Sequence, residues 1–237
     1  YAEYLASVDN ALQLLDSDAD LVRCWVADLM DKGCAVSSVC RKLSSLRAFF
    51  SYMKVAGRIA ANPVDGVHAP KKQKLLPSFI KEEEVEELCD SAFSGDDFIS
   101  IRNKTIISTF YELGLRLSEL CSLNVAGVDF MENQVKVRGK RDKERIIPFG
   151  ANLKALLVDY LKIRSDVASV GEDALFVSVR GCRISVSQVY CMVREQLARV
   201  TSIKRKSPHT LRHTFATVML NNGAELGVVK ELLGHEK

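Results

Sequence analysis

The strongest structural signal in the chain is the stretch Ser207-Pro208-His209-Thr210-Leu211-Arg212-His213. Serine is favoured as a helix N-cap, and proline suits the first helical position because its missing N–H has no intrahelical partner there. We therefore predict a helix over 208–221, with His209 in its first turn and Arg212 one turn further on the same face. The free N–H groups of a helix N-terminus favour an anion, so this end is predicted to bind a phosphate. Three basic residues just upstream add positive charge: Lys204, Arg205 and Lys206.

This stretch also has more ordinary interpretations. An isolated His-x-x-Arg in a helix is more often a surface pair than a binding site. His209 and His213 have the i, i+4 spacing of zinc metalloprotease helices, but Thr210 stands where those enzymes place the glutamate base. Zinc is therefore disfavoured.

Elements on either side of this helix complete a second domain that is mainly helical. Helices are predicted from Ser78 through its acidic first turn to about 93, and over 97–113, 151–164, 186–200 and 225–233. Residues 134–138 alternate and 144–149 begin a second extended run, which predicts a hairpin with a charged tip. A short strand is predicted near 175–178. The sheet should therefore be small and antiparallel.

The N-terminal part reads as a helical bundle. Apolar residues recur at three- and four-residue spacings up to about 58, and Gly33 and Gly57 mark helix ends. The stretch from His68 to Pro77 has two prolines bracketing Lys71, Lys72 and Lys74, which is typical of a stiff basic linker. We predict a bundle at 1–68, a linker at 69–78 and an α+β domain at 79–237, in a protein of mainly α class.

Composition limits the function without identifying it. With 237 residues and a formal charge of +3, any binding to nucleic acid must come from local basic clusters. The seven cysteines show no C-x-x-C spacing that would suit zinc or a redox pair. Several fall on apolar helical faces, so we interpret them as buried thiols in a reducing compartment. No apolar run approaches the length of a membrane span, and we expect a soluble, cytoplasmic protein.

Three further stretches carry residues suited to a phosphodiester. Arg116 follows a helix break at Gly114, and Glu119 three residues later could hold its guanidinium in place. Lys140 lies at the predicted hairpin tip, and His235 follows a Leu-Leu-Gly helix end. Two guanidinium groups match the two non-bridging oxygens of a phosphodiester. Each stretch alone also fits an ordinary solvated surface.

Taken together in order, these motifs carry a specific resemblance. Gly-Leu-Arg-Leu-Ser-Glu-Leu, Gly-Lys-x-x-Lys-Glu-Arg-x-x-Pro, His-x-Leu-Arg-His-x-Phe-Ala-Thr and Leu-Leu-Gly-His resemble the tyrosine recombinase (phage integrase) family, especially its bacterial Xer-type members. The resemblance spans the whole chain and implies a SAM-like core-binding domain followed by a catalytic domain.

The resemblance also implies roles for individual residues. Arg116 and Arg212 would clamp the scissile phosphate, with Glu119 supporting Arg116. Lys140 would protonate the departing 5′ oxygen, His209 would handle a proton and contact the phosphate, and His235 would hydrogen-bond it. No metal, nucleotide or other cofactor is implied.

The family's nucleophile is a tyrosine that follows the last motif histidine, and here it would lie beyond Lys237. None of the six tyrosines stands in that context. The resemblance therefore implies a recombinase that cleaves and rejoins DNA through a 3′-phosphotyrosyl intermediate, while the chain as given is expected to bind DNA without cleaving it.

The implied partners are double-stranded DNA with a specific recombination site and three further protomers in a homo- or hetero-tetramer, with or without a partner recombinase or an activating protein, and no membrane. We expect DNA contacts from the helix carrying Arg41, Lys42 and Arg47, from the linker lysines Lys71, Lys72 and Lys74, from Arg141 and Lys143 of the hairpin, and from Lys204, Arg205 and Lys206.

Two other functions remain open from the sequence. A catalytically inactive relative would occupy its DNA site without cleaving it, and a type IB topoisomerase would relax DNA without pairing sites. Within the recombinases, chromosome dimer resolution at cell division and integration or excision of a mobile element use the same active site, so the sequence leaves that choice open.

Overall fold

The structure is a computed structural model of the chain, and it describes residues 1–71, 80, 84, 87–88, 95–139, 143–203 and 206–234. It divides into two compact units, Tyr1–Leu76 and Pro77–Lys237. The division falls inside the basic segment at 69–78.

The first unit is a small helical bundle made of α1 (Ala2–Val8), α2 (Ala19–Asp31) and α3 (Val36–Val55). Asp18 caps α2 by accepting a hydrogen bond from the Leu21 N–H at 2.8 Å. Gly33 lies in the turn after α2 with φ +75°, a conformation that favours glycine. The apolar stripes of α2 and α3 then form one core, centred on Trp25, Leu43 and Phe50.

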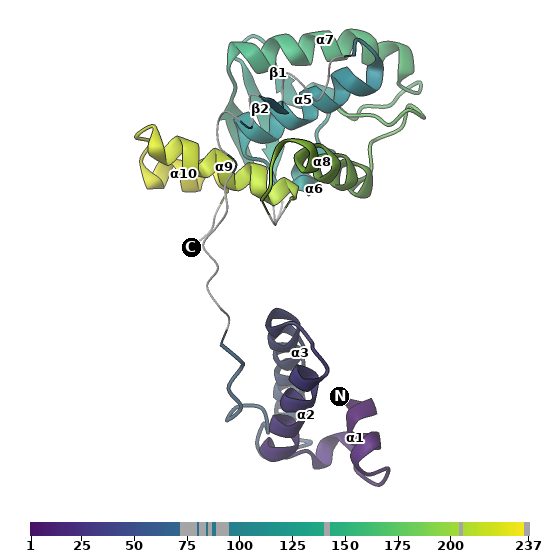
Figure 1. The fold of residues 1–237 in the computed structure, drawn as a ribbon, viewed down its shortest axis with the longest axis vertical. Coiled ribbons are helices and arrows are strands. Elements are labelled where there is room, and N and C mark those ends of the chain that lie inside the picture. Colours follow the sequence, from purple (N-terminus) through teal and green to yellow (C-terminus); the bar gives the residue numbers. More distant parts are fainter. Residues whose placement is uncertain are drawn as a thin grey trace. The chain divides into compact units, whose positions relative to one another are not determined.

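The second unit is mainly helical and contains a small sheet (Figure 1). Its helices include α5 (Phe98–Leu113), α6 (Leu117–Cys121), α7 (Ala151–Val167), α8 (Val186–Val200), α9 (Pro208–Asn221) and α10 (Leu226–Leu233). Helix α9 has Pro208 in its first turn, as predicted. Ser207 is the N-cap residue, but its side chain makes no capping hydrogen bond and instead lies 3.4 Å from the Thr210 hydroxyl.

The sheet has three antiparallel strands in the order β1 (Val128–Asp129), β2 (Gln134–Arg138) and β3 (Glu144–Pro148). The predicted hairpin is confirmed, and its register pairs Val137 with Arg145. Val135, Val137 and Ile147 point into the core because side chains alternate between the two faces of a strand. The sequence did not predict β1, which is only two residues long.

The core of the second unit lies where α5 packs against α7 and α9. Ile106, Phe110 and Leu113 of α5 are fully buried, as is Tyr160 of α7. The Tyr160 ring stacks on Phe176 with centroids 5.4 Å apart, and its hydroxyl accepts a hydrogen bond from the Val177 N–H. Helix α5 therefore forms the centre of the domain, and its C-terminal end leads directly into the turn at Gly114.

Two predictions are wrong. The segment 175–178 is not a strand: Val177 forms an isolated bridge with Arg183, and Ala174, just before the segment, forms another with Asn124. Carbonyls of this stretch are partly satisfied by a side chain, since Arg164 donates to Ala174 and Leu175. Cys121 is buried, but Cys24, Cys182 and Cys191 are exposed. Cys24 and Cys191 lie outside the buried faces of α2 and α8, and Cys182 lies in a bend.

The helix predicted from Ser78 to about 93 falls mostly outside the described residues, of which 84, 87 and 88 are helical. Among the described helices, none combines the length and the apolar character that crossing a membrane requires.

Candidate functional site

The turn between α5 and α6 positions the first arginine of the site. Helix α5 ends at Leu113, and Gly114 follows in the left-handed conformation with φ +57°. A Cβ at this position would lie 2.4 Å from Cδ1 of Phe215, so any larger residue would clash with α9. Leu115 is then buried, and Arg116 becomes the N-cap of α6. The turn therefore has room only for glycine.

Glu119 is the centre of the site. It lies in the first turn of α6, where a negative charge is favoured by the helix dipole. Its Oε2 accepts the backbone N–H of Arg116 at 2.8 Å, and its Oε1 accepts Nη1 of Arg116 at 2.7 Å. The side chain is 4% exposed, so these hydrogen bonds form away from bulk water.

A second guanidinium reaches the same carboxylate from β3. Arg145 Nη1 donates to Glu119 Oε1 at 3.0 Å, and Nη2 donates to Oε2 at 2.8 Å. Such a two-bond pairing fixes the carboxylate in orientation as well as in position. Arg145 reaches inward because it lies on the same face of β3 as Ile147, which is buried in the core.

The third guanidinium is that of Arg212 in α9. Its Nη1 donates to the Gly114 carbonyl at 2.6 Å, and the same nitrogen lies 3.9 Å from Glu119 Oε2. Its Nη2 donates to the Leu233 carbonyl at 2.6 Å. The side chain is 8% exposed, compared with 26% for Arg116. Arg212 is thus buried against the backbone, while Arg116 reaches the surface.

The C-terminus of α10 binds all three arginines. The carbonyls of three consecutive residues each accept one guanidinium: Leu232 from Arg145 at 2.8 Å, Leu233 from Arg212 at 2.6 Å and Gly234 from Arg116 at 3.0 Å. The last carbonyls of a helix lack intrahelical partners and carry the negative end of the dipole. Cations are therefore favoured at this end, and each arginine fills an otherwise unpaired acceptor.

These contacts set the charge states of the site. Burial by itself would raise the pKa of the Glu119 carboxyl, but hydrogen bonds from Arg145 and Arg116 outweigh it and lower the pKa to about 2. Burial and the neighbouring Arg116 charge lower the pKa of Arg212 to about 10, which leaves it charged at neutral pH. The site therefore holds a fixed carboxylate among three cations.

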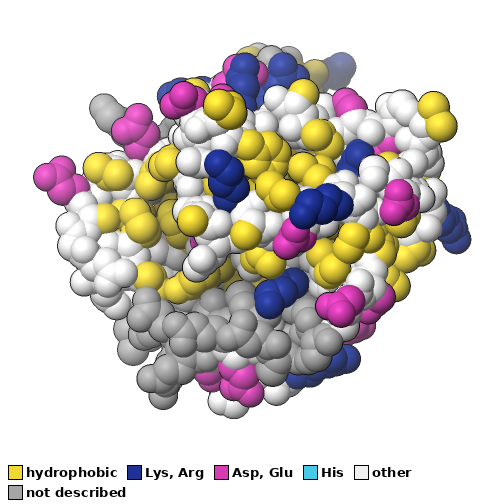
Figure 2. Space-filling view, turned by 90° about the horizontal axis from the view of Figure 1, so that it is seen from above, with side chains coloured by type: hydrophobic (Ala, Val, Ile, Leu, Met, Phe, Trp, Pro, Cys, Tyr) yellow, Lys and Arg dark blue, Asp and Glu magenta, His cyan; other side chains and the backbone are white. Residues whose placement is uncertain are grey.

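A cavity of about 1170 Å³ opens beside these residues, between the β2–β3 hairpin and α10. Its lining includes five cationic residues, which are Arg116, Lys136, Lys143, Arg145 and Lys230, and two acidic ones, Glu144 and Glu231. On the face shown in Figure 2, by contrast, lysine and arginine are scattered among acidic and apolar side chains. The excess of cations at the cavity suits a large anion such as a phosphodiester.

The structure thus brings Arg116, Glu119 and Arg212 together from α6 and α9. His209 is exposed in the first turn of α9, three residues before Arg212. Among the basic candidates, Lys143 lines the cavity, Lys71 is exposed and Lys206 is half-buried. Outside the described residues lie Lys72, Lys74, Lys140, Arg141, Lys204, Arg205 and His235.

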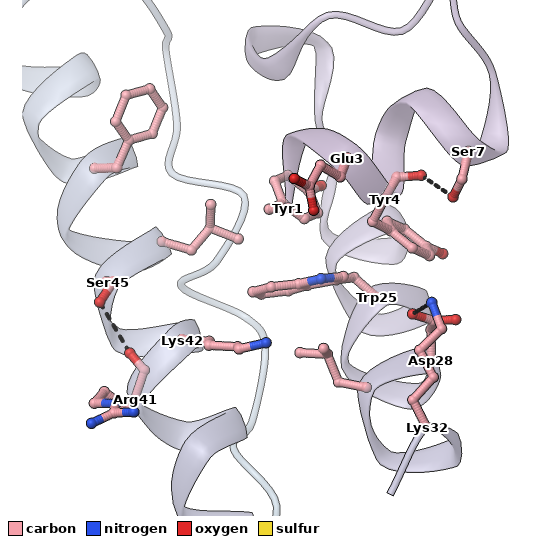
Figure 3. Close-up of a pocket in the computed structure, with 13 residues that line it drawn as sticks. Tyr1, Glu3, Tyr4, Ser7, Trp25, Asp28, Lys32, Arg41, Lys42 and Ser45 are labelled. Atoms are coloured by element: carbon pink, nitrogen blue, oxygen red, sulfur yellow. Dashed lines mark hydrogen bonds and ion pairs between the residues drawn. The ribbon is translucent and has the colours of Figure 1, made fainter. Parts of the chain in front are cut away.

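In the first unit, Arg41 and Lys42 of α3 line a groove of about 680 Å³. Figure 3 shows Lys42 pointing across this groove toward Trp25 of α2. Arg47 differs from them, since its Nη2 donates to the carbonyls of Val64 at 3.3 Å and Val67 at 3.0 Å. It therefore ties the segment after α3 to that helix, whereas Arg41 and Lys42 remain exposed.

Sequence reasoning missed Arg145 as a member of the site. One signal could have identified it. Arg145 lies two residues before the buried Ile147 in the second extended run, and residues two apart in a strand share one face. The pattern therefore places a charge on the inward face of a strand. A charge in that position requires a partner, and Glu119 is that partner.

In the part of the chain that the structure describes, no three His, Cys, Asp or Glu side chains are grouped as metal ligands.

Comparison with known proteins identifies a family and several relatives. A sequence model described as the phage integrase family matches residues 78–237. The protein named tyrosine recombinase XerC in Thermodesulfovibrio yellowstonii is 41% identical over 220 residues, which cover 91% of this chain and 73% of the relative. The tyrosine recombinase XerC of Vibrio atlanticus is 42% identical over 219 residues, which cover 92% and 70%.

Solved structures share the fold. The crystal structure of XerA recombinase matches with a TM-score of 0.61 at 27% identity, covering 99% of this chain and 82% of that one. The XerH site-specific recombinase, bound to a palindromic difH substrate in a post-cleavage complex, matches with a TM-score of 0.82 at 21% identity, covering 99% and 70%. At that identity the likeness to XerH concerns the fold alone.

Proposed function

Since the chain belongs to the phage integrase family, the tyrosine recombinases of site-specific DNA recombination, we propose that its arginine site binds the phosphodiester at which DNA is cut and rejoined. One observation carries the proposal. Arg116 and Arg212 come from helices far apart in sequence, yet both lie at Glu119, and Arg116 lines a cationic cavity.

The two arginines are proposed to clamp the two non-bridging oxygens. Each guanidinium keeps hydrogens beyond those used by Glu119 and the backbone carbonyls, because the group carries five N–H donors. Attack on phosphorus increases the negative charge on these oxygens. Cations fixed beforehand by Glu119 and by α10 stabilise that charge more in the transition state than in the ground state.

The proton and bond changes follow the same scheme. A tyrosine hydroxyl attacks phosphorus, the bond from phosphorus to the 5′ oxygen breaks, and a 3′-phosphotyrosyl ester forms. We assign the tyrosine proton to His209 and the proton for the departing 5′ oxygen to Lys140, with His235 hydrogen-bonding the phosphate. The phosphotyrosyl ester conserves the energy of the broken phosphodiester bond. A 5′ hydroxyl of a second strand can therefore attack the same phosphorus, release the tyrosine and complete rejoining.

We assign the nucleophile to a tyrosine outside residues 1–237. Tyr1, Tyr4 and Tyr52 belong to the first unit, and Tyr160 of the second unit is fully buried. The Tyr160 hydroxyl accepts a hydrogen bond from the Val177 N–H, and Tyr1 packs edge-to-face with Trp25 at 5.0 Å between ring centroids. Among the described residues that line the cavity, none is a tyrosine. The 237-residue chain is therefore expected to bind DNA without cutting it.

The substrate in this proposal is double-stranded DNA with a specific recombination site, held by a tetramer of this protein or of this protein with a partner recombinase in the cytoplasm. The exposed Arg41 and Lys42 would contact DNA from the first unit, and Lys143 and Lys206 from the second. Such phosphate contacts position the protein, while contacts to base edges give sequence preference.

A nicked suicide substrate tests this function. DNA carrying the recombination site is incubated with protein that includes the segment after Lys237, and with the 237-residue chain as control. The longer protein should form a covalent adduct at the site, and the control should only shift the DNA. Binding without an adduct by both proteins would indicate a catalytically inactive relative, and site-independent relaxation of supercoils would indicate a topoisomerase.

The biological role follows from which DNA is bound. We propose either chromosome dimer resolution or integration and excision of a mobile element. Sequencing of DNA cross-linked to the protein in cells separates the two. A single chromosomal site would support the first role, and the ends of a mobile element would support the second.

A further inference from the structure

Arg145 connects the parts of the arginine site, although the proposed chemistry gives it no role. It donates both Nη groups to Glu119, at 3.0 and 2.8 Å, and its Nε to the Leu232 carbonyl at 2.8 Å. All three of its guanidinium nitrogens are therefore used within the protein. The side chain is 13% exposed, so this pairing is shielded from water and geometrically fixed.

The Arg145 guanidinium also lies between two glycines that flank it in space, Gly139 and Gly234. A Cβ built on Gly139 would be 3.6 Å from Arg145 Nη1, and one built on Gly234 would be 3.3 Å from the same atom. Gly139 ends the described part of the hairpin arm, and Gly234 ends α10. The guanidinium therefore packs between the hairpin and the C-terminus of α10, with Glu119 of α6 as its third neighbour.

We propose that Arg145 is a positioning residue for the phosphate clamp, which orients Arg116 and Arg212 by fixing Glu119 and the last turn of α10. The inference rests on the proposed function of those two arginines. Arg116 donates to Glu119 Oε1, which Arg145 also holds, and Arg212 donates to Leu233, the neighbour of the carbonyl that Arg145 holds. Loss of Arg145 would free the Glu119 carboxylate and the last turn of α10, to which both clamp arginines are hydrogen-bonded.

The charges around Glu119 support the same role for Arg145 as the contact geometry does. Glu119 faces Arg116 from its own helix, Arg145 from β3 and Arg212 from α9. Of these, Arg145 is the partner whose guanidinium binds both carboxylate oxygens, whereas Arg116 reaches Oε2 through its backbone N–H. Without it the buried carboxylate would have fewer hydrogen bonds to offset desolvation and would be drawn toward Arg212, which changes the direction of both clamp guanidiniums.

The substitution Arg145→Lys tests the positioning role. Arg145→Lys keeps the positive charge, but an ammonium cannot bind two carboxylate oxygens and a carbonyl in the planar arrangement of a guanidinium. The matched control is Arg164→Lys, since Arg164 is also buried and donates to the carbonyls of Glu172, Ala174 and Leu175, away from the clamp. Both variants lose a structural guanidinium, but only one is next to Glu119.

The first measurement does not depend on catalysis. Guanidinium Nε–H signals in nuclear magnetic resonance spectra of protein labelled with ¹⁵N-arginine are assigned through Arg116→Lys and Arg212→Lys. Arg145→Lys should shift or broaden both signals, while Arg164→Lys should leave them in place. Unchanged Arg116 and Arg212 signals in Arg145→Lys would overturn the proposal, whatever reaction the protein catalyses.

The second measurement is adduct formation on the suicide substrate in a single turnover, with the longer protein that carries the segment after Lys237. Arg145→Lys should lower the rate at saturating DNA by about 100-fold, as expected for misplaced catalytic groups, with DNA affinity unchanged. A rate equal to that of Arg164→Lys would overturn the proposal. If the unsubstituted protein forms no adduct, the proposed function fails and the resonance measurement alone decides the role of Arg145.

A double-mutant cycle shows whether Arg145 acts through Glu119. In a Glu119→Gln background, Arg145→Lys should reduce the rate much less than it does alone, because the carboxylate it fixes is already gone. Equal reductions in both backgrounds would contradict the proposed route. Thermal unfolding of each variant separates loss of folded protein from loss of positioning.

Discussion

At the scale of single residues, one carboxylate organises three cations. Glu119 accepts two hydrogen bonds from Arg145 and two from Arg116, and lies 3.9 Å from Arg212. Three like charges this close repel one another, and the carboxylate and three backbone carbonyls offset that repulsion. The buried Glu119 carboxylate therefore allows three guanidinium groups to lie close together, and the net charge of the site stays positive.

Replacing the exposed clamp residue should remove activity without removing the fold. In Arg116→Lys, the ammonium cannot hold Glu119, the Gly234 carbonyl and a phosphate oxygen together. We expect adduct formation on a suicide substrate to fall by about 100- to 1000-fold, the usual effect of losing one preorganised donor. Arg164→Lys is the control. Equal rates for the two variants would contradict a role for Arg116 at the phosphate.

Acid should weaken the protein through Glu119. Its pKa is about 2 in the folded protein against an ordinary value of 4.5, so the folded state favours the ionised form. The stability it contributes is present above about pH 4.5 and is lost as pH falls toward 2, amounting to on the order of 3 kcal/mol. The free energy of unfolding in urea, measured at pH 5 and pH 3, checks this.

The matched variant for that measurement is Glu119→Gln, which has no charge to lose. The unsubstituted protein should be the more stable at pH 5, and its advantage should shrink at pH 3. Parallel losses in the two proteins would show that other carboxylates account for the acid sensitivity.

At the scale of elements, helix ends build the site. Gly114 is the C-cap of α5, Arg116 is the N-cap of α6 and Gly234 is the C-cap of α10, and all three caps take part in the network around Glu119. Helix ends leave unpaired carbonyls and N–H groups. Here the arginines and the glutamate take up several of these groups, so the same contacts that complete the helices also orient the charged side chains.

Gly114 should tolerate no side chain. Gly114→Ala would combine a left-handed backbone with a Cβ 2.4 Å from Phe215. We expect a loss of more than about 2 kcal/mol, since the left-handed conformation and overpacking each carry a penalty of roughly 1 to 2 kcal/mol. Urea unfolding measures the loss.

Gly223→Ala separates the two penalties. Gly223 also has a positive φ, +85°, but a Cβ there would meet nothing within 4 Å. Its substitution should therefore cost only the conformational penalty, and the difference between the two variants gives the cost of the clash with Phe215. Equal losses would mean that α9 moves aside freely at Gly114.

At the scale of the whole molecule, the largest hydrophobic cores of the two units share no residues among those that the structure describes. One is built from residues between Val22 and Val67, and the other from residues between Ile80 and Leu211. The arginine site belongs entirely to the second unit. Stability of the site should therefore depend on the second core and not on the first.

Core truncation in each unit tests this separation. Leu43→Ala in α3 and Leu157→Ala in α7 both remove fully buried side chains, each worth about 2 to 5 kcal/mol. Hydrogen exchange followed by mass spectrometry should show faster exchange within 1–71 for the first variant and within 95–234 for the second. Acceleration in both units by either variant would show that they unfold together.

Much of this architecture could be predicted from the sequence. The helices over 186–200 and 208–221 were predicted with the bounds observed, because Pro208 and the apolar periodicity act locally. The hairpin followed from alternation in 134–138 and 144–148. The segment at 175–178 could not be predicted correctly, since buried arginines rather than a neighbouring strand satisfy part of its backbone.

The sequence by itself thus determined most of the helices of the second unit and its β2–β3 hairpin, the helix ends at Gly114 and Gly234, and which family the motifs indicate. Only the tertiary structure brought Arg116, Arg145 and Arg212 onto Glu119 and onto the last carbonyls of α10. The hydrogen bond from Arg116 to Gly234 joins residues 118 positions apart. Periodicity and capping act within a few residues, whereas a contact of this kind exists only after the core has packed the helices and strands together.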